Sequence, residues 1–230
     1  MGYRFDIAIR TTHKYAVQAS GDVARVIDLP DGGVAVLVID GQGSGRAARA
    51  VARSVATRLS EMLESGASAA TSAMAANETL YSDRGGQVSV SFDIIRVAAN
   101  GTIEMAGYST NTGVIFDDGW KTTDTNSVPA GRSYGALPRV SRYDAGTVNA
   151  VVLVTDGIAS SYRSETEMLS ALERLGDSFE PCRVAEVLLE ESLLAADGRP
   201  RDDLTVAVIA LSSDPADQRI ERTDHSRSVR

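Results

Sequence analysis

The chain has 230 residues, with 43% hydrophobic and 23% charged, the composition of an ordinary soluble globular protein with its own core. Its net charge of −8 argues against nucleic acid or an anionic membrane surface as the main partner, because both require clustered Lys and Arg. No stretch approaches the roughly 20 apolar residues of a membrane span, and the start has no signal-peptide core. The single cysteine, Cys182, excludes an intrachain disulfide. We therefore expect a cytoplasmic protein.

The first half of the chain predicts a strand at residues 3–9, a further candidate strand at residues 13–19 and a β-hairpin at residues 25–39. Two helices are expected after it, at residues 47–63 and 68–81. The hairpin turns at Asp31-Gly32, a dipeptide typical of tight turns. Its second strand, residues 34–39, is apolar throughout and is therefore expected to be covered on both faces.

The second half predicts two hairpins, at residues 88–109 and 113–122, followed by an irregular stretch at residues 124–146. A buried strand is expected at residues 148–155, and helices are expected to start at Ser164 and at Pro181. A final buried strand at residues 204–211 precedes a polar tail at residues 213–230. Because hairpins join most strands and the helices fall into two paired blocks, we expect an α+β protein. The pattern suggests antiparallel sheets with helix pairs packed outside them. Residues 1–212 would form one domain, and residues 213–230 would be a frayed C-terminal tail.

Four acidic strings mark the ends of predicted strands. Asp40-Gly41 and Asp156-Gly157 each close an apolar run, Asp202-Asp203 opens the last one, and Asp22 precedes the hairpin. Acids at the ends of buried strands are costly unless a positive charge meets them. With only two histidines in the chain, these acids indicate hard divalent cations held by oxygen.

An Asp-Gly pair is often only a turn, and we accept that interpretation for Asp31-Gly32 and Asp118-Gly119, each of which sits in a hairpin. Asp40 and Asp156 differ because each follows five or six apolar residues. Two ions bridged by one carboxylate can activate a water molecule and neutralise a phosphate. Asp40, followed by a glycine whose backbone carbonyl can turn toward a cation, suits that bridging position.

The strings resemble the metal-dependent protein phosphatases of type 2C, and especially their bacterial SpoIIE-like branch. The resemblance spans roughly residues 10–212 and rests on four segments in the family's order and spacing: residues 20–22, 40–45, 155–158 and 202–206. It implies an α-β-β-α sandwich of two antiparallel sheets flanked by paired helices, with two divalent ions, Mn²⁺ or Mg²⁺, at one end. It also implies hydrolysis of phosphoserine or phosphothreonine on a protein by a metal-activated water.

The resemblance also implies a role for each acid. Asp40 would bridge both ions and Gly41 would offer its carbonyl, while Asp22 would serve one ion. Asp156 and Asp202 would serve the other ion. These four aspartates are the candidate catalytic residues. Asp203 stands where the family often has Asn, so we expect it to support the site without binding metal.

Three departures from the better-known members stand out. Gln42 occupies the place of a histidine thought to act as general acid, and residues 15–21 contain no phosphate-binding arginine. Residues 106–109 contain no carboxylate for a third metal. The bacterial branch commonly lacks these features too. Arg46, in the first turn of the predicted helix, is a candidate phosphate contact, although a solvated surface role is the simpler interpretation.

Other functions fit less well. The loop at residues 41–45 is rich in glycine, yet it lacks the P-loop ending, and Asp40 would repel a phosphate. A serine hydrolase would have to rely on His13 as its base. A noncatalytic regulatory module with this fold is the main alternative. Relatives in this branch often act on phosphorylated antagonists in sigma-factor pathways, which makes a phosphorylated regulatory protein the expected substrate. The irregular residues 123–146 are a candidate substrate face.

Overall fold

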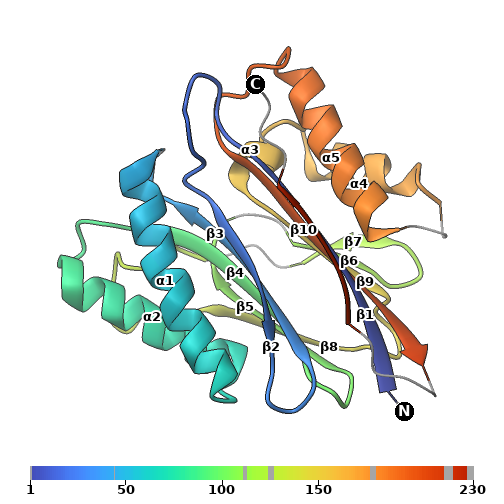
Figure 1. The fold of residues 1–230 in the computed structure, drawn as a ribbon, viewed down its shortest axis with the longest axis horizontal. Coiled ribbons are helices and arrows are strands. Elements are labelled where there is room, and N and C mark those ends of the chain that lie inside the picture. The colour runs from blue at the N-terminus through green and yellow to red at the C-terminus, as the bar shows by residue number, and fades with distance from the viewer. Residues whose placement is uncertain are drawn as a thin grey trace.

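The computed structural model describes residues 2–43, 45–110, 113–123, 127–176, 180–214 and 220–226. Two β-sheets stack face to face, and a group of helices covers the outer face of each sheet (Figure 1). Helices α1 and α2 pack on one sheet, and α5 packs on the other. The α-β-β-α sandwich expected from the sequence is therefore confirmed.

The first sheet has the order β2-β3-β4-β5-β8 in the described part of the chain, and all its neighbours are antiparallel. Its strands are β2 (Val23–Asp28), β3 (Val34–Gly41), β4 (Val90–Val97), β5 (Thr102–Tyr108) and β8 (Arg139–Asp144). Strand β3 is central and buried along almost its whole length, which explains its unbroken apolar sequence.

The second sheet has the order β11-β1-β10-β9-β6-β7 among the described residues. Its strands are β1 (Gly2–Thr12), β6 (Val114–Phe116), β7 (Trp120–Thr122), β9 (Ala150–Val154), β10 (Leu204–Asp214) and β11 (Ile220–Ser226). Strand β11 runs parallel to β1 at the edge, while the other pairs are antiparallel.

The helices are α1 (Arg46–Glu64), α2 (Ala69–Arg84), α3 (Asp156–Ala159), α4 (Glu165–Glu173) and α5 (Pro181–Ala195). Local signals fix several of their ends. The Ser164 hydroxyl accepts the backbone N–H of Glu167 at 3.2 Å, as the predicted capping motif requires, and Pro181 opens α5. None of the helices in the described residues is long and apolar enough to cross a bilayer.

Three expectations differ from the structure. Residues 13–19 form turns, because Ala16 takes a positive φ of 62° and the chain folds back after β1. Strand β8 lies inside the stretch expected to be irregular; it places Arg139 inward and exposes Val140 at the sheet edge, which reverses the usual strand pattern. Part of the tail expected to fray forms β11 along β1.

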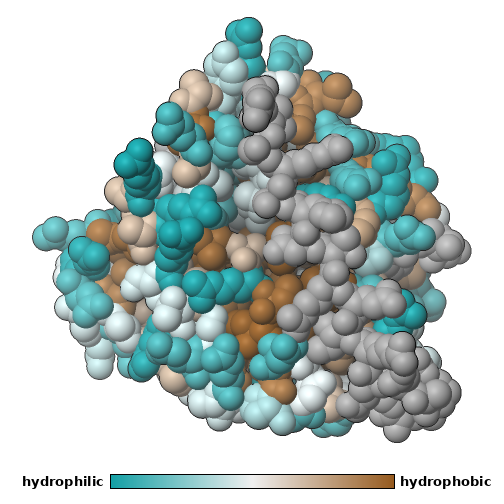
Figure 2. Space-filling view, viewed as in Figure 1, coloured by the Kyte–Doolittle hydropathy of each residue, from teal (hydrophilic) through white to brown (hydrophobic). Residues whose placement is uncertain are grey.

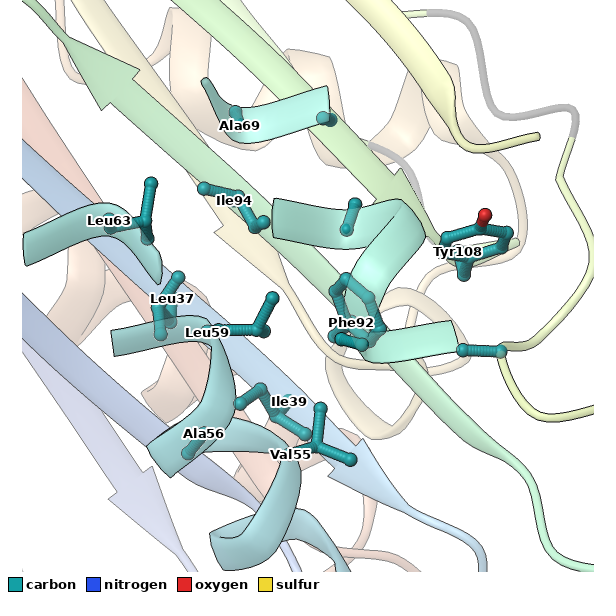
Figure 3. Packing of buried hydrophobic residues seen from close by; sticks show 14 of the residues in the cluster. Leu37, Ile39, Val55, Ala56, Leu59, Leu63, Ala69, Phe92, Ile94 and Tyr108 are labelled. Carbon is teal, nitrogen blue, oxygen red and sulfur yellow. The ribbon is translucent and has the colours of Figure 1, made fainter. Parts of the chain in front are cut away.

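The core between α1, α2 and the first sheet is built from aliphatic and aromatic side chains of both layers (Figure 3). Leu37 and Ile39 of β3 and Leu59 of α1 are fully buried there. The helix thereby fixes the carboxyl end of β3, where the first acidic string lies.

Candidate metal centre

The antiparallel pairing of strands brings the four acidic strings to one end of the sandwich, at the top of Figure 1. Val23 pairs with Ile39, so Asp22 at the start of β2 lies beside Asp40 at the end of β3. In the other sheet Val206 pairs with Val154, so the segment before β10 lies beside Asp156 at the start of α3. Strand ends from both sheets therefore meet at a common edge.

Hydrogen bonds between the two sheets tie this edge together. The Thr205 hydroxyl of β10 donates to Asp22 Oδ2 at 2.7 Å. In return, the buried Asp203 carboxylate accepts the backbone N–H of Gly21 at 2.6 Å and of Lys14 at 2.8 Å. Asp203 therefore holds the segment that carries Asp22.

Asp22 is buried and Asp40 is half-buried, and both have strongly raised pKa values. Burial, strengthened by the charges of Asp203 and Asp156, raises the pKa of Asp22 to about 7 in spite of hydrogen bonds from threonine hydroxyls. Burial first, and then repulsion from Asp22 and the other site acids, raises the pKa of Asp40 to about 8. Both values show that this edge concentrates negative charge in a poorly solvated place.

Asp156 and Asp202 lie on the solvent side of the same edge, and both are exposed. Although the residue as a whole is exposed, partial burial of its carboxyl group and the charge of Asp202 raise the pKa of Asp156. Asp202 Oδ1 accepts the backbone N–H of Asp203 at 2.9 Å. The four candidate ligands thus comprise two inner and two outer carboxylates, electrostatically coupled to one another.

The two glycines after the acids permit close packing. A Cβ on Gly41 would lie 2.5 Å from the carbonyl oxygen of Ala48 in α1, and one on Gly157 would lie 2.2 Å from the carbonyl oxygen of Asp203. Gly41 is part of β3 and is not among the glycines with positive φ. Gly41 was expected to be needed for its conformational freedom. The fold instead requires glycine here because there is no room for a side chain.

The donor set fits divalent cations in its chemistry, because every candidate is a hard oxygen ligand. Among the described residues, no Lys, Arg or His lies within ion-pair distance of these carboxylates. The same residues contain no group of three acidic, His or Cys side chains already arranged to hold an ion. Within the described chain, these acids therefore gather at one edge without a neighbouring cation.

Sequence reasoning missed the roles of three residues that hold Asp22. Thr205 and Thr155 hydrogen-bond with Asp22, and Ser20 Oγ accepts the backbone N–H of Asp22 at 3.0 Å. Threonines are frequent in strands, so the threonine positions in the sequence do not indicate this role.

Two residues that the sequence singled out also lie in this region. The Gln42 side-chain oxygen accepts the N–H and the hydroxyl of Ser89. Arg46 is exposed at the start of α1.

Comparison with known proteins agrees with this architecture. The family described as Stage II sporulation protein E (SpoIIE) matches residues 30–212. The chain therefore belongs to the SpoIIE family, and its fold is that of PP2C phosphatase domains. Divalent metal dependence is general for this fold. None of the curated protein sequences matches the chain.

Solved structures with the same fold have low sequence identity. The PP2C phosphatase domain of the cell fate determinant SpoIIE from Bacillus subtilis is 20% identical, with a TM-score of 0.77 over 91% of this chain and 64% of that chain. The RsbU and RsbW domains of a Mycobacterium tuberculosis protein are 17% identical, with a TM-score of 0.73 over 92% and 62%. Serine/threonine phosphatase Stp1 from Staphylococcus aureus is 11% identical, with a TM-score of 0.72 over 91% and 96%.

Proposed function

We propose that this chain hydrolyses phosphoserine or phosphothreonine on a regulatory phosphoprotein, with two divalent ions, Mn²⁺ or Mg²⁺, as cofactors. The observation that carries the proposal is the acidic centre itself. The buried Asp22 and the half-buried Asp40, with pKa values raised to about 7 and about 8, stand together without a cation from the described chain. Such an arrangement costs folding free energy, and a bound divalent cation offsets that cost.

Asp40 would contact both ions, and Gly41 would add its carbonyl oxygen. Asp22 would serve one ion, and Asp156 with Asp202 the other. When bound, the ions would neutralise phosphate charge and lower the pKa of a water molecule so that it can attack phosphorus. We assign residues 1–212 to the catalytic unit and residues 213–230 to a C-terminal segment that contributes an edge strand.

The residues around the acids hold them in place. The Thr205 hydroxyl occupies one oxygen of Asp22 and leaves further carboxylate lone pairs for an external ligand. Asp203 fixes the backbone ahead of Asp22, and the glycines let α1 and the 202–204 segment approach closely. Gln42 cannot act as an acid and its oxygen is held by Ser89, so we assign protonation of the leaving serine oxygen to water.

We propose a cytoplasmic location and a phosphorylated regulatory protein as substrate. SpoIIE and the RsbU and RsbW domains among the structural neighbours support this class of partner, and a sigma-factor pathway antagonist is the first candidate. A noncatalytic regulatory module is the second candidate function. The absence of the family's general-acid histidine and of an arginine in residues 15–21 favours it, whereas the retained acids favour the enzyme.

Phosphate release from an aryl phosphate and from a phosphoserine peptide tests the proposal. We expect turnover with Mn²⁺ or Mg²⁺ and its loss in excess chelator. The same protein refilled with Mn²⁺ after chelation should recover its rate, which controls for irreversible damage. Metal-independent turnover, or none with either ion on both substrates, would contradict the proposed function.

A further inference from the structure

A cleft of about 540 Å³ opens beside Asp22, between the loop after β1, the start of β2 and the first half of α1. Its described lining contains the three arginines Arg25, Arg49 and Arg53, and Asp22 is the one acid. A local excess of positive charge in a chain of net charge −8 is unexpected for a featureless surface. In Figure 2, hydrophilic side chains gather over α1, next to an apolar area in the middle of the same face.

Two of the cleft arginines, Arg49 and Arg25, have neutral partners. Arg49 Nη1 donates to the carbonyl oxygen of Ser20 at 3.4 Å, and Arg25 donates to Ser60 Oγ at 3.2 Å and Thr57 Oγ1 at 3.4 Å. No carboxylate of the described residues lies within ion-pair distance of the three guanidinium groups. Their charges are therefore available to an external anion.

Two buried polar atoms in the cleft wall also lack a described hydrogen-bond partner: Thr12 Oγ1 and Arg49 Nε. Buried polar groups are nearly always satisfied in folded proteins, so two such atoms in one wall suggest a site built to receive a ligand. The Arg49 guanidinium donates to the backbone carbonyl of Ser20, which lies two residues before Asp22 in sequence.

The arginines follow one another along a line. Arg49 and Arg53 are one helical turn apart on α1, and Arg25 reaches the following turns at Thr57 and Ser60. From residue 49 to residue 57 the helix rises roughly 12 Å. That length matches about four residues of an extended peptide.

We propose that this arginine cleft binds the phosphorylated segment of the substrate. Arg49, the guanidinium held next to the acidic centre, takes the phosphoryl group, in the absence of an arginine within residues 15–21. Arg53 and Arg25 take acidic side chains that flank the phosphoserine. The preferred substrate is therefore a phosphoserine in an acidic sequence. This proposal rests on the phosphatase function proposed above.

Two phosphoserine peptides of equal length test the proposal, one with Asp and Glu around the phosphoserine and the other with Asn and Gln. Fluorescence anisotropy measures their binding to metal-free protein, and phosphate release with Mn²⁺ measures kcat/KM. Wild type should prefer the acidic peptide in both assays. Arg53→Glu should lower that preference about fivefold, in keeping with the modest strength of exposed ion pairs.

Arg58→Glu is the matched control, because Arg58 is an exposed residue of the same helix outside the cleft lining. It should keep the wild-type preference. Arg49→Ala should lower kcat/KM on both peptides by about tenfold or more through KM, and Arg49→Lys should restore part of it, because charge-assisted hydrogen bonds are the strong ones.

The outcomes separate the two proposals. Metal-dependent hydrolysis with equal peptide preference in wild type, Arg53→Glu and Arg58→Glu would overturn the arginine cleft and leave the phosphatase function intact. Arginine-dependent binding of the acidic peptide without phosphate release from any substrate would overturn the phosphatase function and leave the cleft. Melting temperatures of each variant check that the fold is retained.

Discussion

Buried or half-buried acids occur in two regions of the first sheet, and the charges of their neighbouring side chains differ. Asp93 in β4 pairs with Arg139 of β8 at 2.7 Å, with both side chains almost inaccessible. Burial raises the pKa of Asp93 to about 6, and the Arg139 charge limits the rise. At the end of the same sheet, Asp22 and Asp40 reach about 7 and about 8, with other acids as their charged neighbours.

The comparison separates a structural acid from a functional one. At Asp93, which serves the fold, the chain provides its own cation in Arg139. Where Asp22 and Asp40 meet, the described chain provides further carboxylates, and the charge remains available to an external cation. If this distinction holds, removing charge from the two regions must have opposite effects on stability.

The largest expected effect is on catalysis. Asp40→Asn should reduce phosphate release by about 10³-fold or more, because it removes the proposed bridging carboxylate and its share of transition-state stabilisation. Steady-state phosphate release with Mn²⁺ measures this. Asp118→Asn, at an exposed hairpin acid, should keep the wild-type rate. Equal activity in the two variants would remove Asp40 from the active site.

The second effect is on stability at the internally paired acid. Arg139→Ala should lower the free energy of unfolding by about 3–5 kcal/mol, because it leaves the buried Asp93 without its charged partner. Urea denaturation measures the loss. Arg142→Ala, on the same strand, should cost less than about 1 kcal/mol since the Arg142 side chain is largely exposed. Equal losses in the two variants would contradict the assigned role of the pair.

At the acidic centre the expected change in the free energy of unfolding has the opposite sign. Asp40→Asn should raise the free energy of unfolding of the metal-free protein by about 1–2 kcal/mol at pH 8, because the substitution relieves repulsion among buried acids. Urea denaturation in chelator reports this change, with Asp118→Asn within about 0.5 kcal/mol of wild type. Destabilisation by Asp40→Asn would mean that the carboxylate is already compensated.

The pH dependence gives the smallest effect. The folded pKa values of Asp22 and Asp40, about 7 and about 8, lie above the ordinary value of 3.8. The folded metal-free protein therefore binds more protons than the unfolded chain at pH values between the ordinary pKa and these raised pKa values. Stability should therefore fall as pH rises through this window, by about 3–6 °C in Tm between pH 5.5 and 8.5. Saturating Mn²⁺ should remove most of the slope, and a rise of Tm with pH in chelator would contradict the account.

Much of the acidic centre was predictable because hydrophobic runs mark strands, and Asp40 and Asp156 stand where such runs stop. The strand pairing that joins Asp22 to Asp40 also follows from a recognisable hairpin. These signals are local in sequence, so they can be recognised without knowledge of the tertiary structure.

The remainder depends on contacts between distant segments. The Thr205 hydroxyl reaches Asp22 because two sheets stack, and the requirement for Gly41 comes from the carbonyl of Ala48 in α1. Arg49 is one of several arginines on its helix, and the packing of α1 against β2 singles it out. Strand β8 escaped prediction because its inward residue is Arg139, whose partner lies on another strand.

Calorimetric titration of the metal-free protein with Mn²⁺ tests the central claim most directly. The account predicts that wild type binds two ions per chain, more tightly as pH rises because bound protons must leave, and that Asp40→Asn loses binding while Asp118→Asn retains it. A wild-type protein that binds no Mn²⁺, or an Asp40→Asn variant that binds it as tightly as wild type, would contradict the account.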